Sequence, residues 1–258
     1  MLTRLALIAT AHADPAARRL GLAADSAGLW FRSRRLRRHW ADHENHCHQA
    51  ITRAIAGLTP RRTVLVLGSG QLRDIPLALL AHTFDSVLLV DAVHLWPARR
   101  QAGRFANVRC VTSDVTGRLA QFAFGFAPNP PLATVKADDS IDLTISANIL
   151  SQLPIAAEEW LERHGRPPAD IAAMAHQLVG EHLAALTRLP GRVCLLSDIE
   201  MQERDRSGTI LARHDLLAGH TLPAPDDAWL WPVAPFGMAQ KERAYLHHSV
   251  AISDFKAA

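Results

Sequence analysis

Cysteine and long apolar stretches are scarce in this chain of 258 residues, and each shortage excludes a class of protein. The three cysteines, Cys47, Cys110 and Cys194, are too few and too scattered for a disulfide framework or a cysteine-based zinc site. No apolar run approaches the roughly 20 residues that a membrane-spanning helix needs. We therefore expect a cytoplasmic protein without a membrane span, and the 48% hydrophobic content is enough for one large core.

The first residues imitate a secretory signal, because a short apolar stretch follows Arg4 and precedes Ala11-His12-Ala13. That stretch is at the lower length limit for a signal, and the basic run of residues 32–38 behind it would hinder export. An amphipathic N-terminal helix is the simpler expectation.

Positive charge is concentrated in one place. Five arginines carry more charge than the formal net +3 of the whole chain, so the remainder is net acidic: Arg32, Arg34, Arg35, Arg37 and Arg38. Such a patch suits a phosphate, an anionic lipid head or an acidic partner, or is simply a solvated helix face. Nucleic-acid binders usually spread charge over a whole face and add stacking aromatics, so we do not expect nucleic-acid binding.

Hydrophobic periodicity predicts a helix over residues 31–56, followed by a change of pattern. Continuous β-branched and aliphatic runs then indicate strands buried on both faces, at 63–67, 86–90, 108–112, 141–146 and 192–197. Helix-length segments between most of them, including 75–83 and 169–188, predict crossovers and a parallel sheet covered on both faces. Residues 125–135 read as a loop insertion, and 228–233 with 244–252 as an antiparallel hairpin at one sheet edge.

Polar and glycine residues follow the predicted strands in order. Gly68-Ser69-Gly70 follows the first strand, Asp91 ends the second, Asp114 follows the third, and Asn148 follows the fourth. In an open parallel sheet the ligand lies beyond these carboxyl ends. A nicotinamide dinucleotide needs a third glycine in GxGxxG, and that position is Arg73, so the pattern favours S-adenosylmethionine over a dinucleotide.

The stretches VLVLGSG, LLVDA, VTSDV and IDLTISANILSQLP resemble the class I, Rossmann-like S-adenosylmethionine-dependent methyltransferases over residues 60–252. The resemblance implies an α/β three-layer sandwich over residues 60–258, with a mostly parallel seven-stranded sheet and a C-terminal antiparallel hairpin. A helical extension over residues 1–59 would cap the pocket. The resemblance assigns the methionine end of the cofactor to Gly68, Ser69 and Gly70, the ribose to Asp91, the adenine to Asp114 and the sulfonium side to Asn148, with Ala92 and Val115 as neighbours.

Two positions depart from the family pattern. Val66 replaces the acid often found before the glycine loop, which removes a usual partner of the cofactor's amino group, and Leu72 replaces the third glycine of GxGxG. The alternative to a working enzyme is therefore a non-catalytic protein that keeps the fold and recruits an acidic partner through its arginines. The turn Asn/Asp-Pro-Pro-aromatic of enzymes that methylate base amino groups is absent after the fourth strand, which favours a small-molecule acceptor with an O, N or C nucleophile.

Three residues are candidates for catalysis: His43, Asn148 and Asp198. His43 lies in the apolar stripe of its helix, where it could serve as a general base or as a hydrogen-bonded core residue. His43 and Cys47 are one turn apart, as metal ligands often are, but the directions of the neighbouring histidines do not favour a metal site. Asp198 follows the fifth strand and could hold a substrate amine or hydroxyl. Trp229 and Trp231 share a strand face and should pack against a helix.

Overall fold

The computed structural model describes residues 2–133, 135 and 139–257. The helices are α1 (Leu2–Ala9), α2 (Pro15–Leu20), α3 (Leu22–Arg35), α4 (Ala41–Ile55), α5 (Leu77–Thr83), α6 (Trp96–Ala102), α7 (Leu119–Phe124), η1 (Leu150–Gln152), α8 (Ile155–Arg163) and α9 (Pro168–Arg188). The strands are β1 (His12–Ala13), β2 (Thr63–Leu67), β3 (Ser86–Asp91), β4 (Val93–His94), β5 (Val108–Thr112), β6 (Ile141–Ala147), β7 (Arg192–Arg204), β8 (Ile210–Asp215), β9 (Asp227–Ala234) and β10 (Ala244–Ile252).

The main sheet confirms the predicted parallel core and its hairpin. Its strand order is β5-β3-β2-β6-β7-β10-β9, and β2 pairs in parallel with both β3 and β6. The C-terminal strand β10 is inserted antiparallel between β7 and β9. The fold is therefore the expected Rossmann-like sheet with a reversed final strand. An eighth strand, β8, was not predicted and pairs with the outer half of β7.

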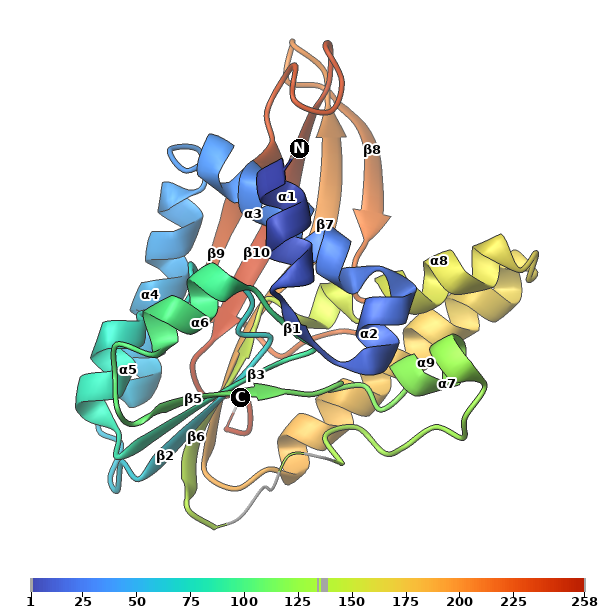
Figure 1. The fold of residues 1–258 in the computed structure, drawn as a ribbon. Helices are drawn as coiled ribbons and strands as arrows, with labels where there is room; N and C mark the ends of the chain where they lie inside the picture. Colours follow the sequence, from blue (N-terminus) through green and yellow to red (C-terminus); the bar gives the residue numbers. More distant parts are fainter. Residues whose placement is uncertain (1, 134, 136–138, 258) are drawn as a thin grey trace.

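Helices cover both faces of the sheet, as the continuous apolar strands require. Figure 1 shows α4, α5 and α6 on one side and α7, α8 and α9 on the other. Along β2, Val64 and Val66 pack in the cluster that includes α4 and α5, while Leu65 and Leu67 pack in the cluster that includes α9. The alternation places every residue of β2 in a core.

The single helix predicted over residues 31–56 is wrong, because the chain turns between α3 and α4. Leu36 and Trp40 are both buried, so the apolar spacing continues across residues 36–40 although the helix does not. Residues 36–40 contain no glycine or proline that would predict this break, and the continuous apolar periodicity predicts an unbroken helix instead. α4 ends at Ile55, close to the predicted end, and Gly57 follows two residues later.

The N-terminal extension lies against the carboxyl edge of the sheet. β1 pairs with β4 through His12↔His94 and Ala13↔Val93, and the backbone N–H of Asp14 donates to the carbonyl of Ala92 at 2.9 Å. The amphipathic first helix is confirmed as α1, which buries Leu7 and exposes Leu2. Across the described residues, no helix combines the length and the hydrophobicity that a bilayer span requires.

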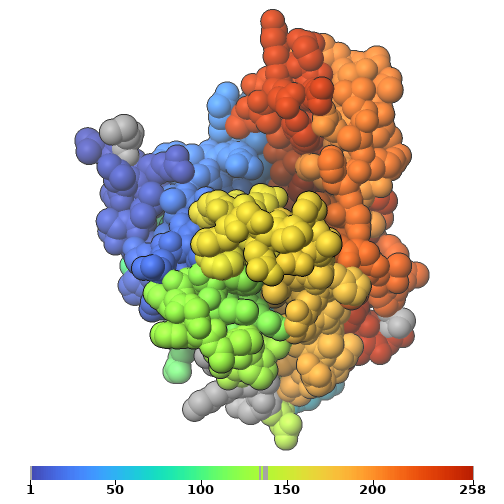
Figure 2. Space-filling model, turned by 90° about the vertical axis from the view of Figure 1, so that its right-hand side faces the viewer, coloured from blue at the N-terminus to red at the C-terminus, as the bar shows by residue number. Residues whose placement is uncertain are grey.

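The C-terminal half also forms an arm. The outer part of β7 pairs with β8 and β10, and these segments rise beyond the helical layers in Figure 1. In Figure 2 the same arm, in orange and red, stands above the yellow helix α8. The arm belongs to strands whose inner halves form the core, so it extends the sheet rather than adding a second unit.

Candidate functional site

The glycine loop after β2 has the backbone that close approach of a ligand requires. Gly68 and Gly70 have φ values of +75° and +45°, in the left-handed region that favours glycine. A Cβ on Gly68 would lie 2.6 Å from Ile149 Cβ, so the loop packs tightly on the segment after β6. At Gly70 the nearest atoms to such a Cβ are at 3.8 and 3.9 Å, the latter being Asp91 Oδ2. Gly70 therefore presents bare backbone beside a carboxylate.

Leu72 keeps the conformation of the glycine it replaces. Its φ is +61°, which costs a non-glycine residue about 1–2 kcal/mol. Its side chain is 4% exposed and packs in the core cluster that contains Leu77 and Leu80. Leu72 therefore combines a left-handed backbone with a side chain that packs in the core.

Asp91 joins the end of β3 to the glycine loop. Its Oδ2 accepts the N–H of Gly70 at 2.8 Å, and its Oδ1 accepts the N–H of Val93 at 3.0 Å. Each carboxylate oxygen can accept two hydrogen bonds, so one position on each remains for a ligand hydroxyl. Ala92 lies directly under the N-terminal extension, through its carbonyl bond to Asp14.

Ser69 belongs to a buried series of hydrogen bonds that the sequence analysis did not predict. Its hydroxyl lies 3.2 Å from His94 Nε2, and His94 Nδ1 lies 3.2 Å from the hydroxyl of Thr112. Burial lowers the pKa of His94, so the ring is held neutral. The series links the first loop, β4 and β5 beneath the N-terminal extension.

Asp114 is occupied mainly with its own loop. Oδ1 accepts from the N–H and the hydroxyl of Thr116 at 2.8 and 2.6 Å, and Oδ2 accepts from the N–H of Leu119 at 2.8 Å, at the start of α7. These bonds hold the loop that leads into α7, and only Oδ2 can accept a further bond. Val115 is buried in the core beside Leu67 and Val90. The adenine role of this segment stays a prediction.

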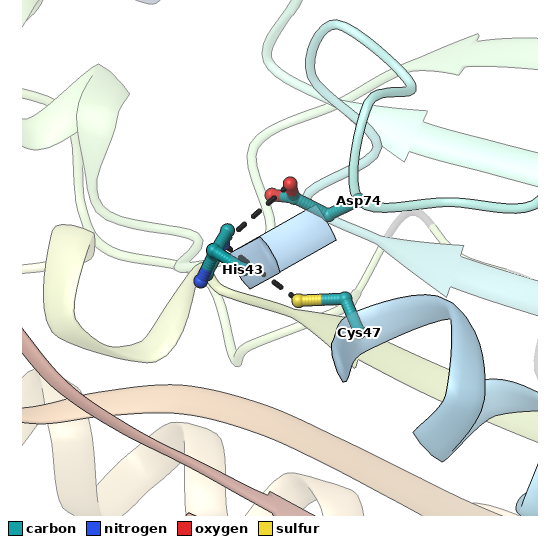
Figure 3. Close-up of side chains that lie close together, drawn as sticks. All are labelled: His43, Cys47 and Asp74. Atoms are coloured by element: carbon teal, nitrogen blue, oxygen red, sulfur yellow. Dashed lines mark hydrogen bonds and ion pairs between the residues drawn. The ribbon is translucent and has the colours of Figure 1, made fainter. Parts of the chain in front are cut away.

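Asn148 lies at the centre of a polar cluster that joins β6 to α4 and the glycine loop. Its Nδ2 is 3.0 Å from Asp74 Oδ2, 3.3 Å from His43 Nε2 and 3.5 Å from Cys47 Sγ. Its φ is +50°, a strained value of the kind found at functional sites. Its Oδ1 is buried and has no partner within the described chain. Figure 3 shows the side chains of His43, Cys47 and Asp74 close together, with His43 in contact with each of the other two.

The tautomer of His43 follows from its neighbours on β9. The indole N–H of Trp229 donates to His43 Nδ1 at 3.0 Å, so Nδ1 is unprotonated and the ring hydrogen is on Nε2, facing Asp74 Oδ1 at 3.6 Å. The ring of Trp231 stacks on His43 at 3.9 Å, and that of Trp229 stacks on His46 at 4.7 Å. The predicted packing of both tryptophans against a helix is confirmed. The general-base role of His43 stays a prediction, and this geometry weighs against it, since neither nitrogen offers a free lone pair.

The donors in this cluster do not suit a metal ion, although His43, Cys47 and Asp74 could each supply one ligand atom. A metal on Nε2 would move the ring hydrogen to Nδ1, where it would face the N–H of Trp229, whereas ligating histidines donate their second nitrogen to an acceptor. The amide nitrogen of Asn148 also occupies the space between the three. Burial, followed by the charge of Asp74, raises the pKa of the Cys47 thiol well above its usual value. The thiol is therefore protonated in this environment.

Asp198, predicted to hold a substrate amine or hydroxyl, lies buried between β7 and β10. Its side chain is 4% exposed, and its two oxygens hold residues of β10: Oδ2 lies 2.7 Å from His247 Nδ1, and Oδ1 accepts the hydroxyl of Ser249 at 2.6 Å. The carboxylate points into the interface between β7 and β10 because the sheet continues past this point into the arm. Asp198 therefore links β7 to β10; its catalytic or substrate-holding role stays a prediction, and this geometry weighs against it.

A cavity of about 220 Å³ lies beside the glycine loop, lined by α3, the loop and α6. Its polar lining includes Ser33, Arg34, Gln71 and Arg73, but none of Asp91, Asp114 or Asn148. We place the functional site at the strand ends rather than in this cavity, because the ligand-ready backbone and carboxylates are there. The arginines of residues 32–38 are exposed at the end of α3 and in the turn after it, and Arg34 stacks on Trp30 with its guanidinium 4.8 Å from the ring centre.

The sequence matches no known family model and no curated protein. Solved structures with a similar fold include Burkholderia thailandensis 1,6-didemethyltoxoflavin-N1-methyltransferase, at 17% identity, 89% coverage of this chain, 87% of that chain and a TM-score of 0.40. The N-methyltransferase NodS from Bradyrhizobium japonicum WM9 is 11% identical, with 83% and 87% coverage and a TM-score of 0.40. The fold of this chain is a Rossmann-like α/β fold, an assignment that rests on the strand order and the reversed β10.

Proposed function

We propose that the protein binds S-adenosylmethionine at the carboxyl edge of the sheet and transfers its methyl group to a small-molecule acceptor. The observation that carries this proposal is the junction of Gly70 with Asp91, where the bare backbone of one strand end meets a carboxylate of the next at 2.8 Å. A glycine loop beside an acid at this place in a doubly wound sheet suits a ribose-containing ligand. A second observation supports it. Asn148 Oδ1, at the end of β6, is buried and has no hydrogen-bond partner within the described chain, so a ligand could donate a hydrogen bond to it.

The candidate residues along the carboxyl edge of the sheet would each bind a different part of the cofactor. The loop of residues 68–70 would hold the methionine end, Asp91 the ribose hydroxyls through its two free acceptor positions, and Asn148 the side nearest the sulfonium. When bound, the cofactor supplies a methyl group already activated by the sulfonium. The chain therefore has to hold the two reactants in line and exclude water, and such positioning can supply most of the rate enhancement.

We place the methyl acceptor beside Asn148, under the N-terminal extension. Helix α4 brings His43 to Asn148, and α3 brings the hydroxyl of Ser33 to Gln71 at 2.7 Å, so the extension covers the loop. An edge covered by helices suits a small acceptor better than a polymer. The pocket-capping role of residues 1–59 is part of this proposal.

Calorimetric titration with S-adenosylhomocysteine tests the proposal. Replacement of Asp91 by Ala removes two charge-assisted hydrogen bonds, each worth roughly 1.5–3 kcal/mol, so binding should weaken at least about tenfold. Asp85→Ala is the matched control, because Asp85 is exposed directly before β3, at the opposite end of the same strand. Absence of binding by the wild-type protein, or equal affinity of both variants, would refute the proposed site.

A further inference from the structure

The N-terminal extension carries an excess of positive charge that is concentrated at the end of α3. Residues 1–38 contain eight arginines and two aspartates, whereas the formal net charge of the whole chain is only +3, so the remainder is net negative. The five arginines of the basic run at residues 32–38 are all exposed, and none of them forms an ion pair with a carboxylate of the described residues. A cluster of this kind attracts a negatively charged surface.

Three large apolar side chains of the same extension are also exposed. Leu2 and Leu5 of α1 are 84% and 55% exposed, and Phe31 of α3 is 38% exposed. All eight residues of α1 are described, and Leu7 is the one that is buried. Because a helix this short is marginal in water by itself, α1 depends on what it packs against. Its outward side presents leucine to whatever lies beyond the protein.

The contacts of α1 place these apolar and basic side chains on one surface. Arg4 Nη2 donates to the carbonyl of Ala24 at 3.4 Å, and a Cβ on Gly28 would lie 3.6 Å from the same nitrogen. Residues three and four apart share a helix face, so Phe31 and Arg35 continue the face of α3 on which α1 rests. Figure 1 shows α1 beside α3, and in Figure 2 the dark blue N-terminal segment projects at the left edge of the molecule.

Two features of this surface favour a lipid bilayer over a nucleic acid. Exposed leucine and phenylalanine can enter the boundary between headgroups and acyl chains, while neighbouring arginines stay at the phosphates. A nucleic acid offers no such apolar layer, and proteins bind its single strands with aromatic rings that are free to stack on bases. Trp30 is not free, because the guanidinium of Arg34 lies 4.8 Å from its ring centre and the ring of Phe31 packs edge-on at 4.9 Å.

We propose that the extension surface, formed by Leu2, Leu5, Phe31, Arg32 and Arg35, binds peripherally to a lipid bilayer that contains anionic headgroups. Apolar contact and charge act together here, because one such signal gives only marginal, reversible attachment and two give stable attachment. The attachment is independent of the methyl transfer proposed above.

Flotation of the full chain with lipid vesicles tests this assignment. The wild-type protein should bind vesicles of phosphatidylcholine in which about a third of the lipid is phosphatidylglycerol, and should not bind phosphatidylcholine alone. Arg32→Gln combined with Arg35→Gln should weaken binding about 10- to 30-fold, since each arginine near a charged surface contributes about fivefold. Leu2→Ser combined with Leu5→Ser should weaken it at least about tenfold.

Two double variants elsewhere on the surface are the matched controls. Arg104→Gln with Arg109→Gln removes the same charge at the amino end of β5, and Leu211→Ser with Leu230→Ser removes two exposed leucines from β8 and β9. Both should bind the charged vesicles as the wild-type protein does. Every replaced side chain is exposed, so the comparison does not depend on the stability of the fold.

Several results would overturn the inference. The first is that the wild-type protein does not bind the charged vesicles, or binds both kinds of vesicle equally. The second is that either extension variant binds as well as its control, which would show that the charge or the leucines of this surface do not contact lipid. The third is tighter binding of a single-stranded RNA than of the charged vesicles at about 0.15 M salt, which would assign the arginines to a nucleic acid instead.

Discussion

Leu72 has a strained backbone and a buried side chain, and substitutions can separate the free-energy contributions of the two. Its side chain is 4% exposed, and truncating a buried leucine to alanine costs about 2–5 kcal/mol. Leu72→Ala keeps a Cβ at φ +61° and so loses the packing while retaining the strain. Leu72→Gly loses the same packing but removes the strain of about 1–2 kcal/mol. We expect Leu72→Gly to be more stable than Leu72→Ala by about 1 kcal/mol.

Urea denaturation of the variants measures this difference, and Leu80 provides the control. Leu80 is fully buried in the same cluster but lies in the middle of α5, where glycine costs about 1 kcal/mol relative to alanine. Leu80→Gly should therefore be less stable than Leu80→Ala, the opposite order to that at residue 72. If Leu72→Gly is no more stable than Leu72→Ala, the left-handed conformation does not strain the loop and our reasoning about it is wrong.

Two further predictions concern buried histidine partners. Burial lowers the pKa of His182 to about 4, so its contribution to stability is complete above the unfolded value of about 6.5 and is lost as the pH falls towards 4. Acidification to about pH 4.5 should cost about 2–3 kcal/mol through this group, and His182→Leu should flatten that part of the pH–stability profile; an unchanged profile contradicts the assignment. The second prediction compares the two tryptophans of β9. Trp229→Phe leaves His43 Nδ1 without its donor, whereas the buried N–H of Trp231 has no hydrogen-bond partner among the described residues. In urea denaturation, Trp229→Phe should therefore destabilise the protein by about 1–2 kcal/mol more than Trp231→Phe. Equal losses would argue against the tautomer assigned to His43.

The parallel core could be predicted from the sequence because its strands are buried on both faces. Thr63–Leu67 has no polar face to conceal it, and the observed strand has the predicted bounds. The arm could not be predicted, because the outer half of β7 and all of β8 alternate charged and partly exposed residues that read as loop. The N-terminal pairing was missed for a different reason, since β1 has only two residues and carries no periodicity.

The candidate site was only partly readable from the sequence. Strand ends and glycines locate Gly70, Asp91 and Asn148, because sheet topology brings them to one edge. Asp74 has no such signal, as a lone aspartate in a polar loop is common, and only its contact with Asn148 distinguishes it. Asp198 is the opposite case. Its position after a strand predicts contact with a ligand, but both of its carboxylate oxygens bond to residues of β10, and the sequence does not show that β10 pairs with this strand.

The two tryptophans of β9 also divide the N-terminal extension into two parts that are held to the sheet in different ways. They stack on His43 and His46, and so tie α4 to the sheet at two successive points. The helices before it are joined to the sheet mainly through the two-residue strand β1 and the contact of α2 with α7. The turn at residues 36–40 therefore separates the part of the extension that α4 fixes to β9 from the part that is held through β1 and α2.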